Sequence, residues 1–316
     1  MHIVILDAQT ITKGDLSFDG LRTLGDVTVY PLTAYEEIAD RVADADAVLC
    51  NKTLLNGYTL RKAAHLCYIG LFATGYNNID IAYAREHGIT VCNAGSYSTE
   101  AVAQHTFGLI LEHYSRVGAY NGFVQQGNWQ NSPTFSPFVF DTEELYGKTI
   151  ALVGYGHSGR AVARIAHAFG MRVLACTRTP QTDENTTFFP LEEMLPLADI
   201  VSVHCPLTPQ TERLLNANTL RLCKHGAFLV NTARGAVVDE VALRHALESG
   251  QLGGAGIDVL ETEPMPTHCP LLGAPNCLIT PHVAWAPIAT RRRLLRIVEE
   301  NLRHFQDGTP MNVVSN

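Results

Sequence analysis

The stretch "ALVGYGHSGRAVARIA", residues 151–166, decides the fold of the larger part of this chain. Its apolar start predicts a buried strand, and Gly154, Gly156 and Gly159 follow in GxGxxG spacing before a helical pattern begins. In this arrangement the first glycine permits a tight turn, the second lets the backbone approach a pyrophosphate, and the third lets the helix pack on the strand. The N–H groups of the first helical turn would then face the phosphates. We therefore expect a dinucleotide-binding Rossmann domain.

The next apolar run, "MRVLACTRTP" at residues 171–180, ends where such domains usually carry the acidic residue that binds the adenosine ribose of NAD. This chain has Thr177, Arg178 and Thr179 there. Without a carboxylate nothing repels a 2′-phosphate, and the guanidinium and two hydroxyls are suited to bind one. The pattern favours NADP(H). The alternative is that Arg178 stacks on the adenine and NAD(H) binds.

Short apolar runs alternate with helical patterns on both sides of the motif, which is typical of parallel sheets covered by helices. The runs before the motif are residues 3–8, 27–32, 47–52, 67–73 and 90–94, with a helical pattern at 34–45. The runs from the motif onward are residues 149–156, 171–178, 200–207, 226–233, 254–260 and 276–284. The fold class predicted is α/β, with two doubly wound parallel-sheet domains.

Two long helices are predicted outside these series. One follows Ser98 as N-cap, with its body at 101–117, and leads into an irregular polar loop at 125–148. The other occupies 287–310, with Pro287 at its start and Gly308 at C′. Its apolar stripe is Ile288, Leu295, Val298, Leu302 and Phe305, and the run Arg291–Arg293 is interpreted as a solvated face.

Composition narrows the class of protein. The 316 residues are 46 % hydrophobic and 17 % charged, which is globular, and the net charge of −8 argues against a nucleic-acid surface. The eight cysteines are scattered singly, so neither a disulfide framework nor a metal site is predicted. The N-terminus begins as a strand rather than a signal peptide, and no apolar run is long enough to span a membrane. We expect a cytoplasmic protein.

Polar residues stand at the ends of three predicted strands. Arg234 follows "AFLVNTA", Asp258 ends "GAGID", and His282 follows "CLITP", while Glu263 lies just beyond Asp258 in "ETEP". Ligands of open parallel sheets bind outside the carboxyl ends of the strands. A cation, an acid and a histidine in one nucleotide-binding domain therefore predict a catalytic site.

The segments "VGYGHSG", "VSVHCPLTPQT", "LVNTARGAVVDE", "GIDVLETEP" and "TPHVAW" resemble the signature segments of the D-isomer-specific 2-hydroxyacid dehydrogenases. "GLFATGYNNID" and "NAGSYSTEAVA" resemble that family's substrate-domain segments, and the glycerate dehydrogenase and hydroxypyruvate/glyoxylate reductase branch is the most similar. The resemblance implies a flavodoxin-like substrate domain, residues 1–98 plus 287–316. A Rossmann domain, residues 99–286, would be inserted in it, with the active site in the cleft between them.

The resemblance also implies roles. Arg234 would bind the substrate carboxylate and polarise the 2-oxo group, His282 would donate a proton to that oxygen, and Glu263 would hold the imidazole. The residues and the resemblance together predict these cofactor contacts: Gly154, Gly156, His157, Ser158, Gly159, Thr177, Arg178, Thr179, His204, Cys205, Pro206, Thr211, Thr232, Ala233 and Asp258. Residues 177–179 depart from the family, which usually has an aspartate at this position. The implied substrate contacts are Ala73, Thr74, Gly75 and Lys52. A homodimer is implied as well.

Three alternatives stay open. A dinucleotide-sensing corepressor of the C-terminal-binding-protein kind resembles the same family, but this chain has no long disordered tail. Many phosphoglycerate dehydrogenases carry a C-terminal regulatory domain, whereas this sequence ends soon after the last helix. Formate dehydrogenase pairs its histidine with glutamine, and Glu263 argues against it.

Overall fold

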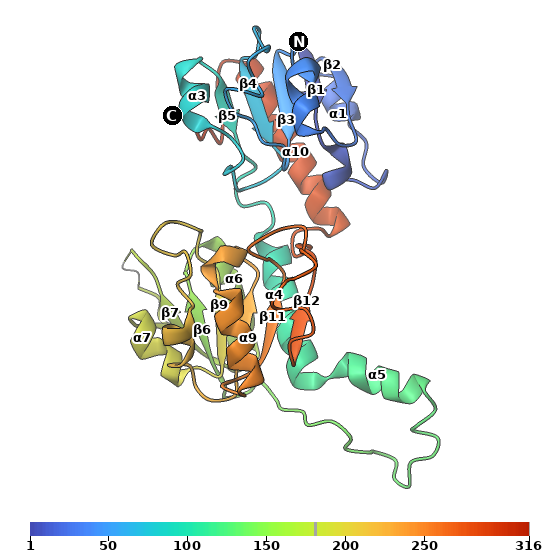
Figure 1. The fold of residues 1–316 in the computed structure, drawn as a ribbon, viewed down its shortest axis with the longest axis vertical. Coiled ribbons are helices and arrows are strands. Elements are labelled where there is room, and N and C mark those ends of the chain that lie inside the picture. The colour runs from blue at the N-terminus through green and yellow to red at the C-terminus, as the bar shows by residue number, and fades with distance from the viewer. Residues whose placement is uncertain (180–181, 316) are drawn as a thin grey trace. The chain divides into compact units, whose positions relative to one another are not determined.

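The computed structural model describes residues 1–179 and 182–315, and the chain divides into two compact units (Figure 1). The first unit is Met1–Ser98 with Trp285–Asn316, and the second is Thr99–Ala284. The chain thus leaves the first unit once and returns to it once.

The first unit holds a five-stranded parallel sheet in the order β2-β1-β3-β4-β5, the flavodoxin-like order (Figure 1). Its strands are β1 (His2–Ile5), β2 (Asp26–Val29), β3 (Ala47–Cys50), β4 (Tyr68–Leu71) and β5 (Thr90–Cys92). Its helices are η1 (Ala8–Thr10), α1 (Asp19–Arg22), η2 (Tyr35–Glu37), α2 (Ile38–Arg41), α3 (Ile81–Glu86) and α10 (Ile288–Gln306). Alternate strand residues enter two separate cores, as the two-residue period of a strand requires.

The last helix, α10, covers one face of this sheet. Its buried residues Leu294, Leu295, Val298 and Leu302 join Ile3, Ile5 and Leu49 from the strands. The predicted boundaries are confirmed, since α10 starts after Pro287, and Gly308 has a φ of 75°. The predicted stripe is wrong at Ile288, the first residue of α10, which is 37 % exposed and does not join this core.

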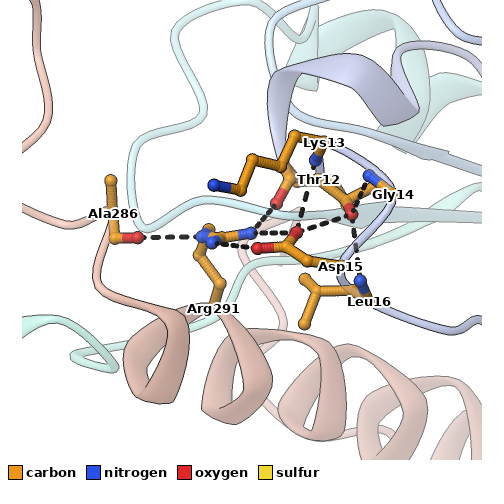
Figure 2. A network of polar contacts seen from close by, with 8 residues as sticks. Thr12, Lys13, Gly14, Asp15, Leu16, Ala286 and Arg291 are labelled. Atoms are coloured by element: carbon orange, nitrogen blue, oxygen red, sulfur yellow. Dashed lines mark hydrogen bonds and ion pairs between the residues drawn. The ribbon is translucent and has the colours of Figure 1, made fainter.

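In the run Arg291–Arg293, which the sequence suggested to be a solvated face, Arg292 and Arg293 are exposed but Arg291 is not. The Arg291 side chain is only 13 % exposed, and its two terminal nitrogens donate to the two carboxylate oxygens of Asp15 at 2.8 and 2.7 Å (Figure 2). Its Nε donates to the Ala286 carbonyl at 2.8 Å. The Arg291 hydrogen bonds hold the pKa of Asp15 well below its usual range. The local sequence pattern could not reveal this ion pair because Arg291 and Asp15 are 276 residues apart.

The second unit holds a seven-stranded parallel sheet in the order β12-β11-β10-β9-β6-β7-β8. Its strands are β6 (Thr149–Val153), β7 (Arg172–Cys176), β8 (Thr186–Phe188), β9 (Ile200–Val203), β10 (Ala227–Asn231), β11 (Leu252–Ile257) and β12 (Cys277–Ile279). Its helices are α4 (Thr99–Ser115), α5 (Val117–Gln125), α6 (His157–Ala168), α7 (Leu191–Met194), η3 (Leu195–Leu197), α8 (Ala217–Leu220), η4 (Gly235–Val237) and α9 (Glu240–Glu248). The winding direction reverses between β6 and β9, so the glycine motif after β6 lies at the switch point where α/β sheets bind ligands.

Local sequence patterns missed some elements. The predicted helix at 34–45 is instead η2 followed by the short α2. The first long helix ends at Ser115, because Arg116 is in the left-handed region with a φ of 52°, and α5 follows in a new direction. Strand β8 has only three residues and forms at the sheet edge through pairing with β7, a long-range effect.

Among the described residues, no helix is both long and apolar enough to cross a membrane.

Candidate active site

Three candidate residues lie along one edge of the second unit's sheet. Strands β10, β11 and β12 are parallel neighbours. Arg234, Asp258 and His282 each come one to three residues after the carboxyl end of one of these strands. The fold therefore brings the three side chains to one edge of the sheet, although each is 24 residues from the next in the sequence.

His282 and Glu263 form the central pair. The imidazole Nδ1 lies 2.7 Å from Glu263 Oε2, and their side chains are 26 % and 34 % exposed. The other carboxylate oxygen accepts a hydrogen bond from the Leu260 backbone at 2.9 Å, which orients the carboxylate. A carboxylate only accepts, so Nδ1 carries the hydrogen and Nε2 is the nitrogen left for chemistry with a ligand.

Asp258 fixes the loop that carries His282. Its carboxylate accepts hydrogen bonds from the Thr280 hydroxyl at 2.6 Å and from the Val283 and Ala284 N–H groups at 2.9 Å each. Its carbonyl accepts from the His282 N–H at 2.7 Å. Burial works against the charge on Asp258, but hydrogen bonds from His105, Thr280 and the two backbone groups outweigh it and lower the Asp258 pKa.

The conformation of His282 itself requires this support. Its φ of 54° is in the left-handed region, which costs a non-glycine residue about 1–2 kcal/mol. Three groups before and after His282 donate to one carboxylate and so keep the turn closed. Strain held by surrounding contacts is typical of functional positions.

Arg234 sits in a loop that is tightly held against the loop of Glu263. Asn231 donates to the Arg234 carbonyl at 2.8 Å and accepts from the Ala233 N–H at 3.0 Å. A Cβ on Gly235 would lie 1.9 Å from the Leu260 carbonyl carbon, so only glycine permits this approach of the two loops. The Arg234 Nη1 donates to the Ala233 carbonyl at 2.7 Å. Sequence reasoning missed Asn231, although a polar residue ending an apolar strand was a signal for it.

The glycine motif has the close contacts that its spacing predicts. Gly154 has a φ of 103°, and a Cβ on it would lie 2.7 Å from the His204 carbonyl carbon. A Cβ on Gly159 would lie 2.3 Å from the Gly154 carbonyl oxygen. Around Gly156 no atom lies within 4 Å of a Cβ. That open space beside the N-terminus of α6, where His157 and Ser158 form the first turn, fits a dinucleotide pyrophosphate.

The segment after β9 lies next to the same turn. His204 Nε2 is 2.8 Å from the Ser202 hydroxyl, and burial lowers the pKa of His204 to about 4. Burial raises the Cys205 pKa to about 11, so this thiol is not reactive at neutral pH. The Thr211 hydroxyl donates to the Pro206 carbonyl at 2.6 Å and closes the loop. Thr232, after β10, bonds the Thr106 hydroxyl of α4 at 3.0 Å.

At the end of β7, beside the motif strand β6, Arg178 and Thr179 are exposed and Thr177 is half-buried. Further along this loop, the Tyr155 hydroxyl of the motif donates to the Asp183 carboxylate at 2.9 Å. This hydrogen bond connects Asp183 to the glycine turn.

The remaining candidates belong to the first unit. Ala73, Thr74 and Gly75 follow β4, where the Ala73 carbonyl accepts from Ala94 at 2.9 Å and the Thr74 hydroxyl donates to the Gly95 carbonyl. Lys52 follows the neighbouring β3 and its side chain is exposed.

The backbone around Lys52 is held by Asp7, which is only 3 % exposed and accepts from the N–H groups of Asn51, Lys52 and Thr53 at 2.7–2.9 Å. Sequence reasoning missed Asp7, an acid at the end of the first strand.

Chemically, the second unit offers an imidazole oriented by a carboxylate, an arginine on the same edge of the sheet, and a cradle for a dinucleotide. Over residues 1–179 and 182–315, no group of three or more His, Cys, Asp or Glu side chains is arranged to hold a metal ion. The set fits acid–base chemistry coupled to a bound nicotinamide.

Comparison with known proteins agrees with this geometry. Residues 107–284 match the family described as D-isomer specific 2-hydroxyacid dehydrogenase, NAD binding domain. The whole chain is 40 % identical to hydroxypyruvate reductase of Blautia hydrogenotrophica over 321 residues, which covers all of both chains.

Two solved structures are similar over nearly the whole chain. A protein from Thermus thermophilus has a TM-score of 0.90 and 38 % identity, covering 99 % of this chain and 100 % of that one. An NADPH-dependent glyoxylate/hydroxypyruvate reductase from Sinorhizobium meliloti has a TM-score of 0.84 and 29 % identity, covering 99 % and 97 %. The predicted fold class and family are confirmed: the chain belongs to the D-isomer-specific 2-hydroxyacid dehydrogenases, oxidoreductases that use a nicotinamide cofactor.

Proposed function

We propose that this protein reduces a small 2-oxo acid, of the hydroxypyruvate or glyoxylate class, to the D-2-hydroxy acid. The observation that carries the proposal is the 2.7 Å His282–Glu263 pair on the sheet edge that also bears Arg234 and the glycine cradle. The names of the relatives in Blautia and Sinorhizobium support the substrate class.

Each residue has a role that its surroundings support. His282 donates a proton from Nε2 to the 2-oxo oxygen while Glu263 holds Nδ1 and stabilises the protonated ring before transfer. Arg234 binds the carboxylate and the oxo group of the substrate through charge-assisted hydrogen bonds. The nicotinamide, when bound, supplies the hydride. In the oxidation direction His282 accepts the proton instead.

The first unit would supply the rest of the substrate site. The backbone of Ala73, Thr74 and Gly75 would bind the substrate carboxylate, and Lys52 would add a positive charge. Both segments follow neighbouring strands, β3 and β4, and both are braced by hydrogen bonds.

For the cofactor we propose a preference for NADP(H). No carboxylate stands at Thr177, Arg178 or Thr179, and Arg178 is exposed at the end of β7 beside the glycine turn. The Sinorhizobium relative is named as NADPH-dependent. NAD(H) remains the alternative if Arg178 stacks on the adenine.

The remaining cofactor contacts proposed come from the turns described above. They are Gly154, Gly156, His157, Ser158, Gly159, His204, Cys205, Pro206, Thr211, Thr232, Ala233 and Asp258. Asp258 would reach the nicotinamide carboxamide only in addition to the donors that it already has within the unit, the Thr280 hydroxyl, two backbone N–H groups and His105.

The deciding experiment measures initial rates of hydroxypyruvate and glyoxylate reduction with NADPH and NADH in parallel. We expect the higher kcat/KM with NADPH and a loss of that preference in Arg178→Ala. Equal preference in the wild type and variant contradicts the role of Arg178. No reduction of either acid with either cofactor contradicts the proposed function.

We also propose a homodimer formed through an arm of the second unit, residues 117–144. Figure 1 shows α5 and the following loop extending away from the sheet of their own unit. Phe135 and Phe138 are 91 % and 92 % exposed, and Val117 and Trp129 are more than half exposed. So many exposed apolar side chains in one segment are unusual for a monomeric protein and are typical of an interface.

Light scattering on the purified protein tests the dimer. We expect twice the chain mass for the wild type, and a shift toward one chain mass for Phe135→Ser combined with Phe138→Ser. Leu272→Ser, an exposed apolar residue outside the arm, is the matched control. A wild-type monomer, or an unchanged mass in the double variant, contradicts the proposal.

A further inference from the structure

We propose that His105, on α4, is a positioning residue that sets the geometry of His282 through Thr280 and Asp258. The proposal rests on the proposed function only in taking His282 as the proton donor. His105 lies 177 positions before His282 in the sequence, and nothing in the sequence pattern joins the two.

The hydrogen-bond roles in this cluster follow from counting donors. The Thr280 hydroxyl has a single hydrogen, and it donates that hydrogen to Asp258 Oδ1 at 2.6 Å. The Thr280 oxygen lies 2.9 Å from His105 Nε2, so it must accept there and His105 must donate. The same Nε2 is 3.4 Å from Asp258 Oδ1. His105 therefore carries a hydrogen on Nε2 that serves Thr280 and Asp258 together.

This donor supports the strained turn at His282. Asp258 holds the turn by one group before His282, the Thr280 hydroxyl, and by two N–H groups after it. Without the His105 hydrogen, the Thr280 oxygen loses its donor. Asp258, which is 2 % exposed, then loses one of the hydrogen-bond donors that offset the cost of burying its charge. The turn then gains freedom to relax from a φ of 54°, and Nε2 of His282 leaves its position.

The helix that presents His105 is well suited to fix a position. Its neighbouring residues Thr106, Phe107 and Leu109 are buried, and it packs against α6, β10 and β11. Thr106 is bonded to Thr232 after β10. A rigid helix thus connects the strand ends of Arg234 and His282.

Four variants test the proposal. His105→Leu removes the donor, His105→Gln keeps an amide N–H near the Nε2 position, and Thr280→Val removes the bridging hydroxyl at nearly constant volume. His113→Phe is the matched control: it is a histidine of the same helix, half-buried and stacked on Phe228 with ring centroids 4.1 Å apart, away from the His282 loop.

We expect kcat of His105→Leu and Thr280→Val to fall about 10- to 100-fold, the effect of a catalytic group displaced by a fraction of an ångström to an ångström. KM for the oxo acid and Kd for NADPH should change less than about threefold, since no ligand contact is removed. His105→Gln should restore most of kcat, and His113→Phe should retain it. An unchanged kcat in both His105→Leu and Thr280→Val, or equal losses in kcat and NADPH affinity with a fall in Tm, overturns the proposal.

A second readout needs no turnover. The ¹³Cε1 chemical shift of His282, assigned by its absence in His282→Gln, should move in His105→Leu and return in His105→Gln. If the wild type reduces no oxo acid but this shift behaves as expected, the proposed function fails and the positioning role stands. If the shift stays at its wild-type value in His105→Leu, the positioning role fails.

Discussion

Two alanine substitutions in the glycine motif should separate packing from cofactor binding. A Cβ on Gly159 would lie 2.3 Å from the Gly154 carbonyl oxygen, and Cβ atoms in proteins essentially never approach closer than 3.0 Å. Gly159→Ala must therefore open the contact between the turn and α6 by at least the difference, 0.7 Å. Both partners are backbone, so no side chain can yield.

The losses of stability and of NADPH affinity can be estimated from this overlap. Inserting a methyl group into a packed contact costs about 1–3 kcal/mol, and a domain of this size loses about 2–4 °C in Tm for each kcal/mol. The same movement withdraws the first N–H groups of α6 from the phosphates. Loss of hydrogen bonds to a charged group, worth about 1.5–3 kcal/mol, weakens NADPH binding about 10- to 100-fold.

Gly156→Ala is the matched variant because its Cβ meets no protein atom within 4 Å, and its φ of −81° suits any residue. We expect its Tm without cofactor to stay within about 2 °C of the wild type, which corresponds to less than about 1 kcal/mol. Its methyl group would occupy the space assigned to the pyrophosphate, so NADPH affinity should fall as in Gly159→Ala.

Thermal unfolding without cofactor and calorimetric titration with NADPH make the comparison. The expected pattern is that both variants lose affinity and only Gly159→Ala loses stability. Wild-type affinity in Gly156→Ala refutes the placement of the pyrophosphate beside Gly156. Wild-type stability in Gly159→Ala refutes the close contact of turn and helix.

Three further outcomes are expected. His282→Asn should lower turnover about 10²- to 10⁴-fold while NADPH affinity stays within about twofold, and wild-type turnover would exclude the proton-donor role. Burial, followed by the charge of Arg116, lowers the pKa of His113 to about 4, whereas an unfolded histidine titrates near 6.5. The unfolded chain therefore binds a proton that the folded chain does not, and the free energy of unfolding falls as the pH drops from 6.5 to 4. In His113→Phe the free energy of unfolding, measured by urea unfolding, should fall less steeply with falling pH, by a slope equivalent to at most one bound proton. An identical slope in the wild type and the variant contradicts the burial of a neutral ring. Arg291→Met should speed hydrogen exchange of the backbone at 11–16, which Arg291 holds through Asp15 and the Ile11 carbonyl, and unchanged exchange shows that this loop is held by other contacts.

What the sequence could predict depended on how local the controlling interactions are. The GxGxxG turn is specified within six residues, so the strand, the tight turn and the close helix packing followed from spacing alone. The ends of β10, β11 and β12 could be predicted because apolar runs stop at polar residues, and parallel order places those ends on one edge. The side-chain pair His282–Glu263 followed only from resemblance, since its members are 19 residues apart.

What the sequence could not predict rests on partners far apart in the chain. Asp15 is bound to Arg291, and Asp7 closes the loop of Lys52. His105 resembles any half-buried histidine on an amphipathic helix until Thr280 is seen beside it. Asp15 and His105 have no local signature because their roles are created by contacts between distant segments rather than by their neighbours in the chain. Asp7 had one, since it is an acid at the end of an apolar strand.

The division of the first unit into two chain segments bears on how the chain folds as it is made. Residues 1–98 supply all five strands, but the helix that seals one face of their sheet, α10, is translated nearly 190 residues later. At ribosomal rates of about 5–20 residues per second, this apolar face waits roughly ten seconds or longer for its cover, while the second unit is already complete. The unit that begins the chain is thus the last to finish. Joining the two termini, which both belong to the first unit, and reopening the chain at Ala284–Trp285 would make that unit continuous and remove the delay.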